Sequence, residues 1–295
     1  MHGIIYYFLP LIPIIVFNRI FLKFPLLLHS KKKANLSIVH ISHRGGAGEE
    51  TENTIGSFEN AFNIKSDMIE TDVHLTKDEQ VVTIHDPSFH RLSDEPLLIS
   101  NTNYEDLPTF TSIIPLSFPS EQYECSLLTE FPKQVPLLED LFKNYPQTAV
   151  NIDIKIDDDV LIDKVDQLIR EYQCENKVVW GSFSHAIYKK LVKKNPNINT
   201  FCSFYDAIRV VALFAFGLLP YFDVGFTYFE FPLFSIIKSE KFNLIPCSSG
   251  PLKRMRDILI ERVAFNPSLF KHLNERGISN ILIIVYCEES SIGRE

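Results

Sequence analysis

The chain has 295 residues, 45% of them hydrophobic, and a formal net charge of −8 at pH 7. This length can bury a large core and suits one barrel-sized domain, while the acidic balance argues against nucleic acid as a partner. The five cysteines are scattered and odd in number, without the paired spacing of a metal site. This pattern argues against a disulfide framework and favours a reducing compartment.

The first 30 residues predict a membrane anchor. They are strongly apolar and long enough to cross a hydrocarbon core of ~30 Å, although Asn18, Arg19 and Lys23 interrupt the run. A cleaved signal peptide is the alternative, but a basic start and a small-residue cleavage site are missing. The lysines at 31–33 should stay on the cytoplasmic side. We therefore expect a protein of the endoplasmic reticulum or another internal membrane, with the following domain in the cytosol.

The next segments predict alternating strands and helices. Residues 36–42 form a short apolar run before the glycine pair 45–46, which is typical of a strand that enters a tight loop. Residues 54–65 carry apolar side chains at helical spacing, and Asn53 or Thr54 can cap that helix. Residues 68–75 and 80–84 predict two further strands.

Polar side chains gather near the ends of these strands. Glu70 and Asp72 share one face of their strand because side chains alternate along it. Two carboxylates this close repel each other unless a cation or a shared proton lies between them, and carboxylates are ligands of the kind that Mg²⁺ and Ca²⁺ prefer. His43, Arg44 and His85 end neighbouring apolar runs. In a parallel α/β barrel the catalytic groups come from strand ends, so we expect these residues to share a site.

Taken singly, each of these residues could equally be a surface acid or a satisfied core histidine. As a set they are harder to explain in that way, because they interrupt apolar strands. Burying each one there without a partner would cost several kcal/mol.

The middle of the chain predicts a long loop and further strands. Residues 94–134 are rich in Ser, Thr, Pro and acidic residues, as expected of an excursion over the mouth of a barrel. Residues 149–156 form the next strand, on which Asp153 and Lys155 share one face. Residues 178–183 form another.

A second apolar run occupies residues 208–219. Twelve residues are short for a transmembrane span, and a span would place the rest of the barrel across the membrane. With the phenylalanines that follow, we predict an interfacial hydrophobic insertion at 208–234, and a span remains the alternative. Residues 267–276 then form an amphipathic helix that ends at Gly277.

Five short motifs follow one another in a fixed order between residues 43 and 86. They are His43-Arg44-Gly45, Glu52-Asn53-Thr54, Glu70-x-Asp72, Thr76-Lys77-Asp78 and His85-Asp86. This ordered set resembles the glycerophosphodiester phosphodiesterase family. The hydrophobic N-terminus and the run from His43 to Glu49 are similar to the small membrane-bound members of that family with lysophospholipase D activity.

The resemblance implies a fold and a reaction. The fold would be a TIM-like (β/α)8 barrel over residues 38–279. The reaction would be metal-dependent hydrolysis of a glycerophosphodiester or lysophospholipid substrate at a membrane. A lysophospholipid, including the N-acyl lysophosphatidylethanolamine type, would lose its headgroup and leave lysophosphatidic acid.

The resemblance also assigns roles to residues. Glu70, Asp72 and Asp153 would hold one Mg²⁺ or Ca²⁺, where the family usually has a glutamate, one methylene longer, at the position of Asp153. The general acid and base would be His43 and His85, in an order that stays open. Arg44 and Lys155 would bind the negatively charged phosphate. Glu52 would hold the metal ligands or Arg44 in place without contacting the substrate. His74 is expected to be a structural neighbour.

The C-terminal part departs from the family. After Gly277 the family continues with a strand that carries a tryptophan, another helix and a last strand, whereas residues 280–295 form an apolar run and a polar tail. We therefore expect a barrel that is incomplete at its C-terminal end. Two alternatives stay open: a lipase similar to sphingomyelinase D, and an inactive membrane-bound homologue.

Overall fold

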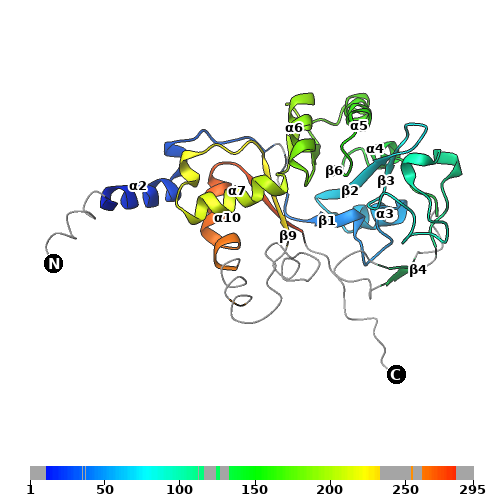
Figure 1. Ribbon diagram of the computed structural model, residues 1–295, viewed down its shortest axis with the longest axis horizontal. Coiled ribbons are helices and arrows are strands. Elements are labelled where there is room, and N and C mark those ends of the chain that lie inside the picture. The colour runs from blue at the N-terminus through cyan, green and yellow to red at the C-terminus, as the bar shows by residue number, and fades with distance from the viewer. Residues whose placement is uncertain are drawn as a thin grey trace, which may run out of the picture.

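A parallel sheet forms the centre of the molecule, as the strand patterns predict. The computed structural model describes residues 11–34, 36, 38–111, 113–115, 124–126, 133–232, 254 and 261–283. Within these ranges, five strands pair in parallel in the order β1-β2-β6-β7-β8 (Figure 1). Their bounds are Ile41–Ser42, Met68–Leu75, Ala149–Ile154, Val178–Gly181 and Asn199–Thr200.

The other strands extend this sheet or lie apart from it. Their bounds are Val81–Thr83 for β3, Ile113–Pro115 for β4, Glu124–Ser126 for β5, Tyr228–Pro232 for β9 and Ser279–Ile283 for β10. β3 pairs antiparallel with β2, while β9 and β10 pair with each other in parallel. A parallel bridge from Phe201 to Tyr228 joins β9 to the residue after β8. The curved sheet therefore continues from β1 to β10.

Helices connect the strands and cover the outside of the sheet. The α-helices are α2 (Leu11–Lys23), α3 (Ile55–Asn63), α4 (Leu138–Asn144), α5 (Asp159–Glu171), α6 (His185–Lys194), α7 (Phe204–Ala215) and α10 (Pro267–Glu275). The short 3₁₀ helices are η1 (Pro25–Leu27), η2 (His43–Gly45), η3 (Ile99–Asn101), η4 (Tyr104–Asp106) and η5 (Leu219–Tyr221). As predicted, Thr54 caps α3, because its hydroxyl accepts a hydrogen bond of 3.2 Å from the backbone of Ser57.

Side chains from successive strands meet inside the curved sheet, as in a barrel. One buried cluster contains Met68, Ala149, Val179, Phe201, Tyr228 and Ile281. They come from β2, β6, β7, the end of β8, β9 and β10. Gly181 is needed here, because a side chain at its position would come within 2.6 Å of the ring of Phe201. This arrangement gives the α/β architecture its barrel-like interior.

The predicted N-terminal anchor has a different local structure from a single apolar span. The apolar run divides into α2 and η1 at Phe24, because Pro25 begins the second helix. Among the residues that the structure describes, no helix is long and apolar enough to cross a membrane. The prediction of a spanning anchor at 1–30 therefore lacks support here, and its first ten residues lie outside the described ranges.

The predicted insertion at 208–234 contains regular barrel elements. It includes most of α7, the short helix η5 and strand β9. α7 buries Ala207 and Val210 against the barrel, while Ile208 and Phe216 are exposed. The start of the apolar run after Gly277 forms strand β10, and residues beyond 283 lie outside the described part of the chain.

The loop predicted at 94–134 has a small core of its own. Phe110 and Ile114 pack there with Phe89 and Leu92 from the preceding segment. η3 and η4 begin the excursion, and β4 and β5 lie farther along it. The segment is therefore a packed cover beside β3 within the ranges described.

Candidate active site

The loop after β1 places the first two candidate residues. Arg44, Gly45 and Gly46 all have positive φ angles, of 52°, 77° and 109°. At Gly45 a side chain would come within 2.4 Å of the hydroxyl of Ser57, so the tight turn requires glycine. The turn directs the backbone N–H of Arg44 to Glu70 Oε2, at 2.6 Å. The His-Arg-Gly sequence thus becomes a strained loop that faces β2.

Glu70 and Asp72, which were predicted to share one face of β2, are both buried, as is Asp153 on β6. In the pairing of β2 with β6, Asp72 lies opposite Asp153, and Glu70 lies opposite Asn151. Nζ of Lys155 lies between the two aspartates, 2.7 Å from Asp72 and 2.6 Å from Asp153. The lysine that the resemblance assigns to phosphate therefore neutralises carboxylates in this structure.

The three carboxylates of this cluster differ in how far neighbouring positive charges compensate their negative charge. Burial would raise the pKa of Asp72, but Lys155 and Arg44 outweigh burial and hold this pKa well below its usual range. Burial and the charge of Asp72 raise the pKa of Glu70 well above its ordinary value. Burial likewise raises the pKa of Asp153, which Lys155 only partly offsets. Glu70 is thus the carboxylate of β2 most in need of a further positive charge.

The two candidate histidines have different environments. Burial and the charge of Arg44 lower the pKa of His43 well below its ordinary value, and its Nε2 lies 3.9 Å from Glu70 Oε2. His85 lies at the rim, where its Nδ1 is 2.7 Å from Asp86 Oδ1. Since the carboxylate can only accept, Nδ1 carries the proton and Nε2 is left facing away from Asp86. His74 donates to the backbone oxygen of His85 at 3.1 Å, as a structural neighbour would.

Arg91, which the sequence reasoning missed, connects both halves of the site. Its Nε donates to Asp86 Oδ2 at 2.7 Å, and Nη2 donates to Glu52 Oε1 at 2.7 Å. Glu52 in turn accepts a hydrogen bond of 3.0 Å from Arg44. One guanidinium therefore fixes the partner of His85 and the partner of Arg44.

Asparagines and a further carboxylate complete the buried cluster. Asn53 donates to Asp72 Oδ2 at 2.9 Å from a left-handed backbone with a φ of 55°. Glu230 on β9 is buried and accepts a hydrogen bond of 3.0 Å from Asn151. Burial raises the pKa of Glu230 to about 8. The sequence did contain a signal for Glu230, because it is the single acidic residue in an aromatic strand. It lies two residues after Tyr228, so both side chains point to the same face of the strand.

The donor atoms suit a hard cation in kind, but they are not gathered around one position. Three buried carboxylates lie on adjoining strands, and Asp153 Oδ1 has no hydrogen-bond partner among the described residues. Over the same ranges, no three His, Cys, Asp or Glu side chains converge as a ready metal site. The ammonium of Lys155 supplies positive charge between the two aspartates instead. The carboxylate oxygens are thus ligands of the kind that Mg²⁺ or Ca²⁺ prefers, but they are arranged here around the ammonium of Lys155.

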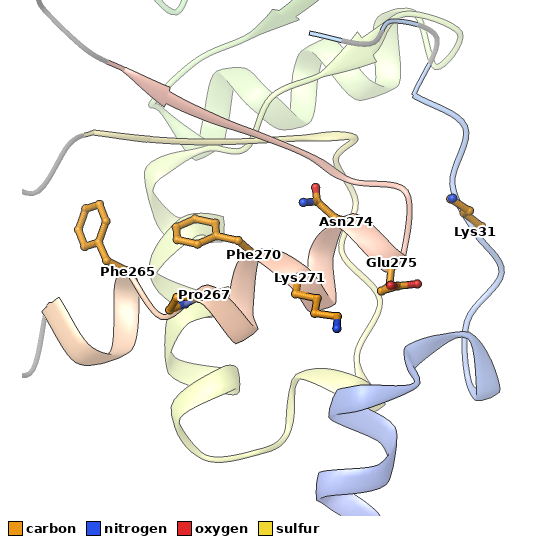
Figure 2. Close-up of a pocket in the computed structure, with 7 residues that line it drawn as sticks. All are labelled: Lys31, Phe265, Pro267, Phe270, Lys271, Asn274 and Glu275. Atoms are coloured by element: carbon orange, nitrogen blue, oxygen red, sulfur yellow. The ribbon is translucent and has the colours of Figure 1, made fainter. Parts of the chain in front are cut away.

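A separate cavity lies away from these residues. It has a volume of about 740 Å³. Figure 2 shows it beside α10, with Phe265 and Phe270 at one end and Lys31 reaching in from the N-terminal segment. None of the candidate catalytic residues lines it.

Comparison with known proteins identifies the family of this chain. Residues 43–211 match the family model of the glycerophosphoryl diester phosphodiesterase family. Human lysophospholipase D GDPD1 is 38% identical over 281 residues, which cover 95% of this chain and 87% of the relative. Human lysophospholipase D GDPD3 is 29% identical, over 98% of this chain and 89% of the relative.

A solved structure shares the fold at low sequence identity. The crystal structure of glycerophosphodiester phosphodiesterase from Agrobacterium tumefaciens str. C58 has a TM-score of 0.56 and 16% identity, and the match covers 83% of this chain and 86% of that one. This likeness supports the barrel-like α/β architecture. The chain therefore belongs to the glycerophosphoryl diester phosphodiesterase family and is a phosphodiester hydrolase.

Proposed function

We propose that this chain is a lysophospholipase D, which hydrolyses the bond between the phosphate and the headgroup of a lysophospholipid to leave lysophosphatidic acid. The observation that carries the proposal is the 38% identity, over 95% of the chain, to human lysophospholipase D GDPD1. The buried cluster of carboxylates, cations and histidines supplies the groups that such a reaction needs.

Arg44 and Lys155 are the proposed phosphate-binding residues. A phosphodiester anion resists attack, so its negative charge has to be compensated as the nucleophile approaches. Arg44 is held by Glu52 and by Asp72, from which its Nε is 3.3 Å away. Such fixed partners orient the guanidinium before substrate arrives, which favours two parallel hydrogen bonds to phosphate oxygens.

His43 and His85 are the proposed acid–base pair. One takes a proton from the nucleophile and the other gives a proton to the leaving group. Asp86 orients His85 through Nδ1, so that Nε2 can exchange the proton. Glu70, Asp72 and Asp153 would hold one Mg²⁺ or Ca²⁺, which when bound places positive charge beside the phosphate.

The finer statements on architecture and location are also proposals. The barrel spans residues 38–279 in this proposal. It is held at the endoplasmic reticulum or another internal membrane, with the site in the cytosol. The apolar first 30 residues and the lysines that follow support this location. Fractionation and imaging of the full chain test it, and recovery in the supernatant after gentle lysis would contradict it.

A headgroup-release assay tests the function. Purified full-length chain is given lysophosphatidylcholine, N-acyl lysophosphatidylethanolamine, glycerophosphocholine and sphingosylphosphocholine, each with and without EDTA. We expect release from the glycerol-based lysolipids, and loss of release in EDTA. Release from the sphingosyl lipid alone would favour a sphingomyelinase-D-like lipase, and the absence of release from every substrate would refute the assignment.

A further inference from the structure

The N-terminal segment is packed on the elements that lead into β9 and β10. α2 contacts α10 and η5, and Figure 1 shows it beside α7 and α10. The ring of Tyr221 in η5 packs edge-on against Phe21 at 5.9 Å. Farther along, the backbone N–H of Lys32 donates to the backbone oxygen of Arg276 at 2.8 Å. Residues 21–32 are therefore joined to the barrel at both ends.

A buried arginine lies at the centre of this contact. Arg276 is 1% exposed, and its guanidinium donates to the backbone oxygen of Phe222 at 3.0 Å and to Asp223 Oδ1 at 3.3 Å. The ammonium of Lys32 donates to the backbone oxygen of Val224 and lies 3.8 Å from the same Asp223 Oδ1. Since the side chain of Asp223 is 74% exposed, water weakens its attraction for both cations. The contact therefore holds poorly compensated positive charge.

Two partners hold His29 in its neutral form. Its Nε2 donates to the backbone oxygen of Pro220 at 2.7 Å, so this nitrogen carries the proton. The other ring nitrogen, Nδ1, lies 3.3 Å from Nη2 of Arg276, and it must accept because a guanidinium can only donate. A proton on Nδ1 would break this hydrogen bond. It would also place a second positive charge directly against Arg276.

His272 on α10 also binds the N-terminal segment. Its Nδ1 donates to the backbone oxygen of Leu22 in α2 at 2.9 Å. Its Nε2 is buried and has no hydrogen-bond partner among the residues that the structure describes. Burial lowers the pKa of His272. The hydrogen bond to Leu22 opposes this effect, and the positive charges of Arg276 and a protonated His29 add to it. A proton on Nε2 would therefore be a buried charge beside another cation.

The groups around the two histidines offer such a proton little compensation. Within the described ranges, α10 contributes Arg276, the N-terminal segment contributes Lys32, and the loop before β9 contributes Asp223. From α7, Arg209 donates to the backbone oxygen of Asp223 at 3.3 Å. The other charged residues of α10 and the N-terminal segment are exposed: Arg19, Lys23, Lys31, Lys33, Lys271 and Glu275. Several cations thus face one exposed carboxylate.

We propose that this contact is an acid-sensitive latch, which holds the N-terminal segment on the barrel while His29 and His272 are neutral and releases it when they gain protons. His272 sets the direction of the pH dependence. Because burial lowers its pKa from 6.5, its stabilising contribution is complete above pH 6.5 and is lost as the pH falls below that value. The candidate catalytic residues lie at the C-terminal ends of the strands, so the latch is separate from them and does not depend on the proposed substrate.

Hydrogen exchange of the purified full chain between about pH 7.5 and about pH 5, the range in which histidine titrates, tests the proposal. The measured quantity is the protection of the amides of residues 21–32, corrected for the effect of pH on intrinsic exchange, with α5 as the internal reference. The variants are His29→Gln and His272→Asn, singly and together. Their amide groups can keep the donations to the two backbone oxygens, but they cannot gain protons. His90→Gln is the matched control, because His90 is exposed and lies outside the latch.

In the unaltered chain the protection of residues 21–32 should fall by about tenfold or more over this range, because each proton that the opened form binds preferentially shifts the equilibrium by up to ~tenfold per pH unit. The amides of α5 should stay protected. The double variant should lose this pH dependence, and the control should keep it.

Constant protection of residues 21–32 down to about pH 5 would overturn the proposal. An equal fall in the double variant would overturn it too, as would a simultaneous loss across α5, which indicates general unfolding by acid. Each single variant should show an intermediate fall, so the test remains decisive if the double variant does not fold.

Discussion

Replacement of Arg91 by lysine should damage catalysis more than its distance from the phosphate-binding groups suggests. The arginine makes two hydrogen bonds to Glu52, of 2.7 and 3.2 Å, one of 2.7 Å to Asp86 and one of 2.7 Å to the backbone oxygen of Pro115. Lysine keeps the charge but lacks the planar fork, so it can keep the bond to one carboxylate and not both. Either Glu52 or Asp86 then loses its fixed position.

The magnitude follows from the number of charge-assisted bonds. Each contributes about 1.5–3 kcal/mol when the pair is sheltered from water, and the side chain of Arg91 is only 14% exposed. Loss of two such bonds with partial compensation by water should lower the free energy of unfolding by about 2–4 kcal/mol. Misplacement of His85 and Arg44 by up to ~1 Å should lower kcat/KM by about 10²-fold.

The pH profile separates a positioning role from a merely structural one. Burial would raise the pKa of Asp86, but hydrogen bonds from His85 and Arg91 outweigh burial and hold it well below its usual range. Weakening the bond from Arg91 raises this pKa, so Asp86 becomes protonated at a higher pH and stops orienting His85. In Arg91→Lys the acidic limb of kcat/KM should therefore move to higher pH.

The assay is headgroup release across pH, together with urea unfolding. Arg170→Lys is the matched control, because Arg170, whose own side chain is largely exposed, forms an ion pair with the buried Asp166 within α5. It should leave the pH profile unchanged. If Arg91→Lys retains both the kcat/KM and the acidic limb of the unaltered enzyme, Arg91 does not position either half of the site.

Three further predictions concern the buried cluster. Glu70→Gln should abolish turnover while the fold is retained, and it should remove any rise in Tm that Mg²⁺ or Ca²⁺ gives the unaltered chain; full activity in excess EDTA would exclude the metal role. His43→Ala and His85→Ala should each lower the rate by about 10²-fold or more, whereas His74→Ala should not, and equal damage from all three would reject the assigned pair. Because burial raises the pKa of Glu230 from 4.5 to about 8, its contribution to stability is complete below pH 4.5 and is lost as the pH rises through about 8. Glu230→Gln should flatten the fall in unfolding free energy over that window, measured by urea unfolding in EDTA, and an unchanged slope would contradict the protonated state.

Local features of the site could be predicted from sequence because they depend on neighbours in the chain. Strand alternation placed Glu70 and Asp72 on one face, and the structure confirms it. The cap at Thr54 was equally local. The pairing of Asp72 with Asp153 was harder, since register across distant strands depends on packing rather than on spacing.

Long-range partners account for what the sequence reasoning missed. Arg91 lies close to Asp86 in sequence, but its other side-chain partner, Glu52, is 39 residues away. Lys155 was expected to bind phosphate, but the sequence reasoning did not predict that its ammonium also lies between two carboxylates. A guanidinium or ammonium can reach several carboxylates from one position, and only the fold decides which of them it meets.

For a related reason, hydropathy alone could not predict which apolar side chains around α7 are buried. An apolar side chain can cover a core or face outward, and both kinds occur within a few residues of α7. Val210 is fully buried against the barrel, while Phe216, less than two turns farther on, is 77% exposed. A hydrophobic run therefore predicted an insertion, but not that its first part packs on the sheet.

The alternation of side chains along a strand, which places Glu70 and Asp72 on one face, also produces an apolar layer and a polar layer inside the barrel. Met68, Ala149 and Tyr228 face the interior near the starts of their strands and pack into an apolar layer. Two residues farther on, the inward positions are Glu70, Asn151 and Glu230, all buried and polar. In the pairing of β2 with β6, Met68 lies opposite Ala149 and Glu70 lies opposite Asn151. The change from apolar to polar inward side chains therefore occurs at the same level on both strands. Apolar packing is thus concentrated near the starts of these strands, and the buried polar and charged groups lie farther along them.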